Sequence, residues 1–176
     1  MKELDSGYQI IEGQINILVV ASHNFDHGRD GKIKLADLGT GDLVRKLCQK
    51  YNFWGIVSTR NQLDPNWYIY SSFRQKVKEI IKNNDILLVI DIHGKSLSSP
   101  CLVELKGNNK FKERYSINVN DFVNNQQQTL AEELDKIVPV LQIEIREDGR
   151  VDTINPIKFS QTQKTITNLI DKIVND

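Results

Sequence analysis

The chain has 176 residues, and its 23 basic and 23 acidic side chains give a formal net charge of zero. With 39% hydrophobic and 26% charged residues it can form a packed core, which excludes a disordered chain. Zero net charge argues against a general nucleic-acid or anionic-membrane binder. No apolar run approaches the roughly 18 residues that span a bilayer, and the polar N-terminus is unlike a signal peptide. The two cysteines form no CxxC pair, so we expect a cytoplasmic protein with one domain over residues 1–176.

The first half of the chain alternates between apolar runs and helical patterns. Residues 15–21 form the first predicted strand, which ends in a polar loop. A helical pattern opens at Asp37, and residues 53–57 form the second strand. Ser72 caps a second helix, and residues 86–90 form the most hydrophobic strand. We expect this last strand to lie at the centre of a sheet, because such runs are typical of strands buried on both faces.

The second half is harder to interpret. Within residues 94–128, only the segments 102–105 and 115–119 resemble short or edge strands. Residues 140–145 form a clear strand, and a turn is predicted at residues 147–150.

Two capping boxes predict helix starts in this half. Thr129 pairs with Glu132, and Ser160 pairs with Gln163 at the start of the final helix. We find no internal repeat and no linker. Alternation of strands and helices predicts an α/β sandwich with a mainly parallel sheet.

Chemistry-bearing side chains gather where the predicted strands end. Because α/β sheets bind ligands beyond the carboxyl ends of their strands, we expect these side chains to share one crevice. Two of the only three histidines belong to this set. The set comprises His23 after the first strand, Arg60, Asp64 and Asn66 after the second, Asp91 and His93 at the end of the third, and Glu144 in the last.

The Asp91-Ile92-His93-Gly94 segment places two polar side chains on one face of a strand, since residues i and i+2 point the same way. His93 could bind a metal through one nitrogen while Asp91 orients it or a neighbour. The alternative is a histidine satisfied by a local hydrogen bond.

His23 has two carboxylate companions for a metal site. Zinc in hydrolytic sites takes three protein ligands and leaves one position for water, so two imidazoles and one carboxylate suit it. Asp26 gives His-x-x-Asp spacing, and Asp37 opens the first helix. Their alternative roles are a solvated loop acid and a helix N-cap. His27 is interpreted as an exposed loop histidine.

Two further residues have both a catalytic and an ordinary interpretation. Glu144 is a general base aimed at water, or it lies on the wet side of an edge strand. Arg60 clamps a substrate carboxylate in bidentate fashion, or it forms a surface ion pair. Other chemistries lack their motifs, because the chain has no GxGxxG, no GxxxxGK[ST] and no GxSxG.

Four segments together resemble the N-formylglutamate amidohydrolase family, zinc hydrolases related in fold to zinc carboxypeptidases. The likeness runs from about residue 15 to about residue 146. The segments are Val19-Val20-Ala21-Ser22-His23, Ser58-Thr59-Arg60-Asn61-Gln62-Leu63-Asp64-Pro65-Asn66, Asp91-Ile92-His93-Gly94 and Leu141-Gln142-Ile143-Glu144-Ile145-Arg146.

The resemblance implies a fold and a set of roles. The implied fold is a three-layer α/β sandwich with a mainly parallel or mixed central sheet, phosphorylase/hydrolase-like, in a single hydrolase-like domain. His23 and His93 are implied as metal ligands and Glu144 as the catalytic acid–base, while Arg60, with Asp64 and Asn66, shapes or binds the substrate end. For the third ligand we prefer Asp37 to Asp26, because Asp37-Leu38-Gly39-Thr40 resembles the family's Glu before Gly-Thr.

The expected activity is zinc-dependent hydrolysis of a C–N amide bond. The substrate is a small acylated amino acid or a peptide-like amide whose carboxylate binds Arg60, and one zinc ion is expected. The family's Gly soon after the first His is absent, and the chain is short for the group, so N-formylglutamate itself is not the expected substrate. One alternative is a non-catalytic module that binds a carboxylate or anion on the same scaffold. Another is a domain with no site, which predicts His23 and His93 more than about 10 Å apart.

Overall fold

In the computed structural model, which describes residues 7–115, 117–122, 129–134 and 136–175, a mixed sheet forms the centre of the molecule. The strand order is β1-β5-β2-β7-β9-β8. The four inner strands run parallel, and β1 and β8 pair antiparallel at the two edges. The strands are β1 (Tyr8–Ile11), β2 (Ile15–Ala21), β5 (Phe53–Ser58), β7 (Leu88–Lys95), β8 (Val103–Gly107) and β9 (Val140–Arg146).

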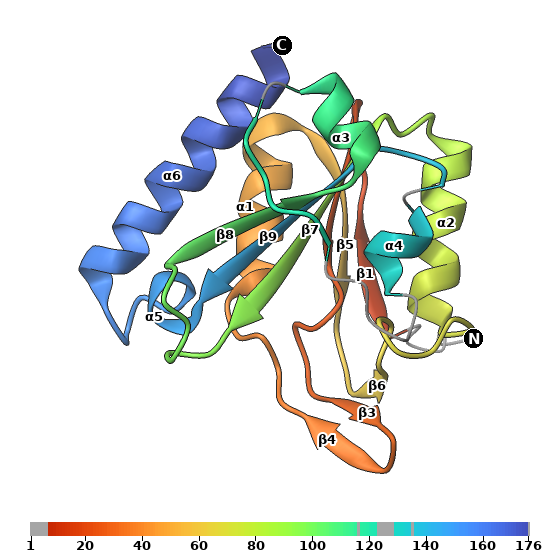
Figure 1. The fold of residues 1–176 in the computed structure, drawn as a ribbon. Coiled ribbons are helices and arrows are strands. Elements are labelled where there is room, and N and C mark those ends of the chain that lie inside the picture. Colours follow the sequence, from red (N-terminus) through yellow and green to blue (C-terminus); the bar gives the residue numbers. More distant parts are fainter. Residues whose placement is uncertain (1–6, 116, 123–128, 135, 176) are drawn as a thin grey trace.

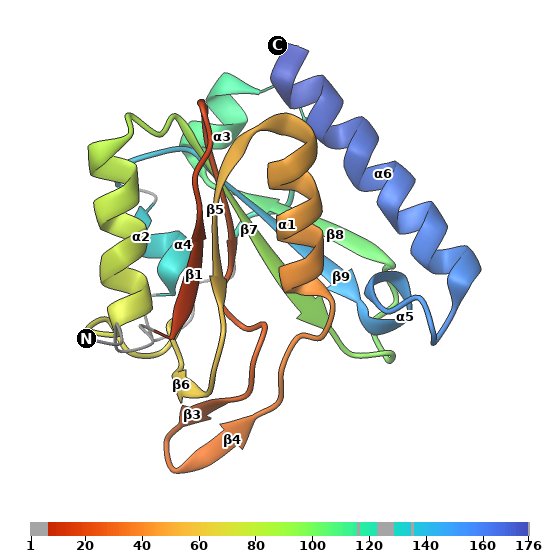
Figure 2. The same cartoon turned by 180° about the vertical axis from the view of Figure 1, so that it is seen from behind.

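Helices cover both faces of this sheet (Figures 1 and 2). α1 (Thr40–Tyr51) and α6 (Pro156–Asn175) pack on one face, and α2 (Ser72–Asn83) and α4 (Leu130–Leu134) pack on the other. Two short helices, α3 (Asn109–Arg114) and α5 (Glu147–Arg150), lie near opposite ends of β9. The predicted three-layer α/β sandwich with a mixed sheet is confirmed.

The apolar strands follow from burial on both faces. In β2, Leu18 and Val20 belong to the core beneath α2, whereas Val19 and Ala21 belong to the core beneath α1. A strand covered on both sides favours apolar residues, so residues 17–21 of β2 form a continuous buried apolar run. His23 lies just beyond the carboxyl end of this run.

A second, small sheet projects beyond the carboxyl ends of the parallel strands (Figure 1). It consists of β3 (His27–Arg29), β4 (Lys32–Lys34) and β6 (Gln62–Leu63) in the order β4-β3-β6. Asp30 and Gly31 join β3 to β4, and both have positive φ, at 50° and 72°. This matches the Asp-Gly turn that favours two-residue hairpins. The sequence pattern predicted only a polar loop there.

Several local predictions are confirmed and others are wrong. The Thr129 capping box forms, because the Thr129 amide donates to Glu132 Oε2 (2.7 Å) and the Glu132 amide donates to Thr129 Oγ1 (3.3 Å). The last helix begins at Pro156 instead of Ser160, because Asn155 Oδ1 accepts the Lys158 amide (3.0 Å) and proline suits a first helical position.

Two short segments also differ from prediction. Residues 147–150 form the short helix α5 instead of a turn. Residues 117–119 form no strand, and pairing there is limited to a bridge between Lys106 and Asn120.

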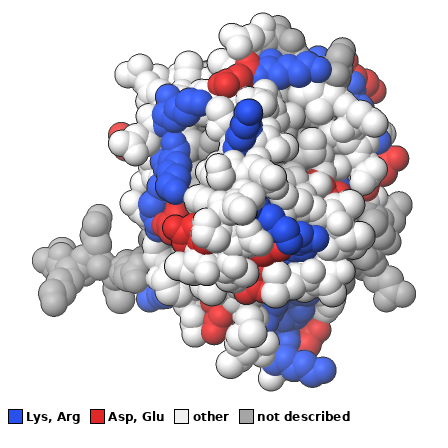
Figure 3. All heavy atoms as spheres, turned by 90° about the vertical axis from the view of Figure 1, so that its left-hand side faces the viewer, with Lys and Arg blue, Asp and Glu red and all other residues white. Residues whose placement is uncertain are grey.

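Surface charge agrees with the balanced composition. On the face that carries α6 and β8, Lys and Arg side chains lie in several separate groups with Asp and Glu between them (Figure 3). Within the described ranges, no helix combines the length and apolarity needed to cross a bilayer.

Candidate metal centre and adjoining pocket

Three predicted ligands meet near the carboxyl ends of β2 and β7, where His93 lies within β7 and His23 follows β2. His23 Nδ1 lies 3.6 Å from Asp37 Oδ2, and His93 Nδ1 lies 3.8 Å from the same oxygen. The two imidazole rings are 4.9 Å apart at an interplanar angle of 75°, and all three residues are buried. His23 and His93 are therefore adjacent, and the separation of more than about 10 Å expected for a domain without a site is not found.

A carboxylate holds each of the two histidine rings from behind. His23 Nε2 lies 2.9 Å from Asp64 Oδ1, and His93 Nε2 lies 2.8 Å from Asp91 Oδ2. If a metal were bound, Nε2 of each ring would keep its proton towards its carboxylate and each Nδ1 would bind the ion, so the Nδ1 proton that His93 carries beside Asp37 would be released. Histidine ligands of metals are commonly oriented by a carboxylate in this way. Asp91 therefore orients His93 as the sequence suggested.

Asp37 reaches this position through backbone contacts on both sides. Its amide donates to the His23 carbonyl (2.7 Å), and its Oδ2 accepts the Gly94 amide (2.9 Å). The N-cap of α1 is Gly39, and no side chain caps that helix, so the N-cap interpretation of Asp37 is wrong. Asp26 is used elsewhere, because its Oδ1 accepts the Ala36 amide (2.8 Å). Of the two candidates for third ligand, the structure brings Asp37 to the histidines.

The electrostatics of this group favour a cation. Burial alone would raise the pKa of Asp37, but His23, His93 and the charge of Lys34 outweigh it and hold that pKa well below its usual range. Burial lowers the pKa of His93, yet the charges of Asp91 and Asp37 prevail and raise it to about 10. The Lys34 amino group donates to His23 Nδ1 (2.7 Å), so it occupies the lone pair that a metal would need, and metal binding would displace this contact. Two imidazole nitrogens and one carboxylate oxygen form a donor set that suits zinc.

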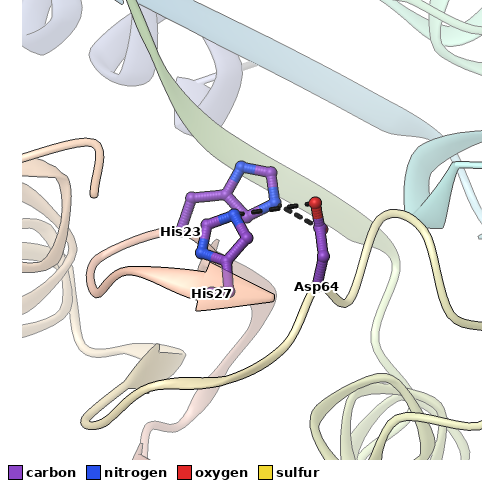
Figure 4. A group of neighbouring side chains, drawn as sticks. All are labelled: His23, His27 and Asp64. Atoms are coloured by element: carbon purple, nitrogen blue, oxygen red, sulfur yellow. Dashed lines mark hydrogen bonds and ion pairs between the residues drawn. The ribbon is translucent and has the colours of Figure 1, made fainter. Parts of the chain in front are cut away.

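A second group of possible ligands shares His23 and adds His27 and Asp64 (Figure 4). The His23 and His27 rings are stacked, 4.2 Å apart at an angle of 23°. Stacked, nearly parallel rings hold their in-plane lone pairs in separate, nearly parallel planes, so the two lone pairs do not meet at one ion about 2 Å from each nitrogen. Asp64 Oδ2 is also taken by Arg29, whose Nε lies 2.6 Å away. Of the two groups, the one formed by His23, Asp37 and His93 therefore has the geometry better suited to a metal.

His27 is buried, with 2% of its surface exposed, so its interpretation as an exposed loop histidine is wrong. Its Nδ1 donates to the Phe25 carbonyl (2.7 Å), and among the described residues its Nε2 has no hydrogen-bond partner. Burial and the neighbouring His23 lower the pKa of His27 to about 4. The ring is consequently neutral at pH 7.

Replacing His27 with Gln is expected to remove a loss of stability on mild acidification. Between pH 6.5 and 4 the unfolded chain binds a proton on His27 that the folded chain does not, so stability falls as pH falls. The slope reaches at most about 1.4 kcal/mol per pH unit. Chemical unfolding of chelator-treated protein across this range measures it, and an unchanged slope in His27→Gln would contradict the assignment.

A cavity of about 800 Å³ opens beside the metal-ligand group. Its lining includes His23, Asn66, Trp67, His93, Lys106 and Glu144. The cavity spans the end of the sheet, because Glu144 in β9 is the register partner of His93 in β7 and their side chains share a face. The cavity is therefore large enough for a substrate longer than a single amino acid.

Glu144 lies between two lysines on this cavity wall. Its Oε1 accepts from Lys106 Nζ (2.7 Å), and its Oε2 lies 3.1 Å from Lys95 Nζ. Burial would raise the pKa of Glu144, but Lys106 and Lys95 outweigh it and lower that pKa. The carboxylate is thus ionised and able to accept a proton.

Of the three residues predicted to bind the substrate, only Asn66 lines the cavity. Asn66 lines the cavity, and its Oδ1 accepts the Leu130 amide (3.1 Å). Asp64 is fully buried and does not line the cavity. Its side chain instead contacts His23 and Arg29. Arg60 is exposed, also absent from the lining, and packs beside Gly7.

The hairpin supplies the cavity with basic side chains that our sequence analysis did not select. Arg29 and Lys34 both line the cavity, and the Arg29 guanidinium lies 4.7 Å from the centroid of the Trp67 ring. The Asp30-Gly31 turn was the signal in the sequence that could have revealed this hairpin.

No family model matches the sequence, and no curated protein matches it. Among solved structures, YndL in a zinc-free form is similar over 82% of this chain and 74% of its own, with 16% identity and a TM-score of 0.42. A bacteriophage poly-gamma-glutamate hydrolase is similar over 82% and 73%, with 14% identity and a TM-score of 0.43. Pyrococcus furiosus PbaA, an archaeal homolog of a proteasome-assembly chaperone, is similar over 79% and 76%, with 9% identity and a TM-score of 0.45. At these TM-scores the likenesses carry no argument about function, which depends on the geometry of the site.

Proposed function

We propose that the protein is a metal-dependent hydrolase of a C–N amide bond, with one zinc ion held by His23, Asp37 and His93. The observation that carries this proposal is the convergence of two imidazole Nδ1 atoms on Asp37 Oδ2, each ring being held by its own carboxylate. An arrangement of two oriented histidines and one acid is typical of catalytic zinc sites with an open position.

Bound at this group, the ion would polarise the amide carbonyl and lower the pKa of a water molecule. The residues of the chain account for the proton transfers. Glu144 faces the same cavity as His93, accepts the proton of the attacking water, and returns it to the leaving nitrogen. Lys106 and Lys95 keep Glu144 ionised before the reaction and fix its orientation.

The proposed substrate is a small acylated amino acid or a peptide-like amide with an anionic end. Arg29 and Lys34 supply positive charge at the hairpin end of the cavity, and Asn66 offers a side-chain amide beside His93. Trp67 adds an apolar surface for the acyl or peptide portion. Substrate contacts by Arg60 and Asp64 stay predictions, and the proposal does not depend on them.

A non-catalytic carboxylate-binding or anion-binding module is the second candidate. Lys34 supports it, because a half-buried lysine at the cavity wall can hold an anion without any metal. Such a module binds its ligand equally well after Glu144→Gln and shows no hydrolysis with any added metal.

The first experiment is metal analysis of the purified protein together with an amidase screen. We expect about one equivalent of zinc per chain after equilibration and dialysis, and release of amine from some N-acyl amino acids or short amides. Fewer than about half an equivalent of zinc would overturn the metal centre. Full zinc loading without hydrolysis of any substrate would favour the binding module.

A further inference from the structure

One arginine contacts both segments that carry the proposed ligands Asp37 and His93, on the side away from the large cavity. Arg150 is the last residue of α5, which packs beside the ends of β9 and β7 (Figure 1). Only 8% of its surface is exposed, and it is absent from the lining of the large cavity. Its guanidinium Nη1 donates to the Leu38 carbonyl, directly after Asp37. Arg150 therefore contacts the ligand loop without reaching the substrate side.

Glycines occur where both ligand segments meet Arg150. A Cβ atom at Gly94, next to His93, would lie 2.7 Å from Arg150 Cζ and Nε. A Cβ atom at Gly39 would lie 2.3 Å from the Arg150 carbonyl oxygen, and Gly39 also has a φ of +85°. Real Cβ atoms do not approach this closely, so the arginine fills the space that a side chain at either position would need.

The charge of Arg150 also acts on Asp37. Its positively charged guanidinium is buried near this carboxylate, and among the described residues its Nε has no hydrogen-bond partner. A buried donor without a partner lowers stability, so packing for stability alone would favour an apolar side chain here. The attraction between the guanidinium and the Asp37 carboxylate partly offsets the loss of stability caused by the unpaired donor.

We propose that Arg150 is a positioning residue that sets the separation of Asp37 from His93. The two segments are already joined, because the Gly94 amide donates to Asp37 Oδ2 (2.9 Å). Arg150 restrains this hydrogen bond on the side away from the cavity. Its guanidinium donates to the Leu38 carbonyl and also fills the space beside Gly94. Without the guanidinium, the Asp37 loop and the end of β7 are free to separate. The inference rests on the proposed metal centre.

Zinc affinity of Arg150→Met, measured by competition with a chelating indicator, tests this role. We expect affinity to fall about 10–100-fold, as for other residues that orient metal ligands. The visible spectrum of the Co²⁺-substituted protein is expected to change, because ligand geometry changes. Arg150→Lys should restore part of the affinity, since an ammonium can still donate to the Leu38 carbonyl. Arg146→Met is the matched control, because Arg146 contacts Asp148 and Ser99 instead of the ligand segments.

Wild-type affinity and an unchanged Co²⁺ spectrum in Arg150→Met would overturn the role of Arg150 while leaving the metal centre intact. Failure of the wild type to bind zinc would instead overturn the metal centre and this inference with it.

Gly94→Ala provides a second arm should Arg150→Met not fold. Its added methyl group displaces the guanidinium and is expected to weaken zinc binding, and Gly94→Ala with Arg150→Ala is expected to recover stability relative to the sum of the single changes. Wild-type zinc affinity in Gly94→Ala would also contradict the proposal.

Discussion

Replacing His93 with Ala is expected to lower bound zinc from about one equivalent per chain to less than about a tenth. The substitution removes one of three converging donors and leaves only His23 and Asp37, fewer protein ligands than the three typical of catalytic zinc sites. The Asp91 carboxylate, now without its partner at 2.8 Å, remains buried and unsatisfied, so some loss of stability accompanies the loss of metal. Atomic absorption after dialysis against zinc-free buffer measures the metal, and circular dichroism confirms that the chain is folded.

His27→Ala is the matched control for this experiment. His27 is as buried as His93 and stacks on His23, but its ring does not converge on Asp37. We expect His27→Ala to retain about one equivalent of zinc. If His27→Ala lost the metal and His93→Ala kept it, the ion would belong to the group formed by His23, His27 and Asp64.

Replacing Glu144 with Gln is expected to lower kcat/KM for an amide substrate by about 10²–10⁴-fold while leaving bound zinc unchanged. Glutamine has the same shape but cannot accept the proton of the attacking water. Lys106 and Lys95 lose their anionic partner, so the wall of the cavity keeps its form but gains positive charge. Steady-state kinetics and metal analysis of the same preparation separate the two effects.

Glu104→Gln serves as the matched variant for Glu144. Glu104 is the register partner of Glu144 on β8 and also contacts Lys95, but it is absent from the lining of the cavity. Its replacement is expected to change kcat/KM by no more than a few-fold. Undiminished hydrolysis by Glu144→Gln would show that another group acts as the base.

The strands and long helices of this fold could be predicted from local patterns. The strand predicted at residues 15–21 coincides with β2, and the second helix begins at Ser72 as α2, although its cap is Ser71 and not the predicted Ser72. Each pattern arises because one face of a helix, or both faces of a strand, is buried against the neighbouring layer of the sandwich. The resulting spacing of apolar residues is visible within a short stretch of sequence. The short strand predicted within residues 115–119 was wrong at residues 117–119, because pairing beside β8 is limited there to a single bridge between Lys106 and Asn120.

The metal-ligand group could be predicted for a related reason. The carboxyl ends of parallel strands meet at one edge, so His23 and His93 were expected to be neighbours once the strands were recognised. The contact between Asp91 and His93 could also be predicted, because residues two apart on a strand point to the same face of the sheet.

The sequence by itself thus determined the α/β class, the edge of the sheet where polar side chains meet, and the candidates His23, Asp37, His93 and Glu144. Only the tertiary structure decided between Asp37 and Asp26. It also showed that Asp64 binds the ring of His23 and that Arg60 does not line the cavity. It also brought Arg29 and Lys34 into that cavity and placed Arg150 behind the ligands. The physical reason is that periodicity records which face of an element is buried, whereas the direction of a loop side chain is set by hydrogen bonds and close contacts between segments distant in sequence.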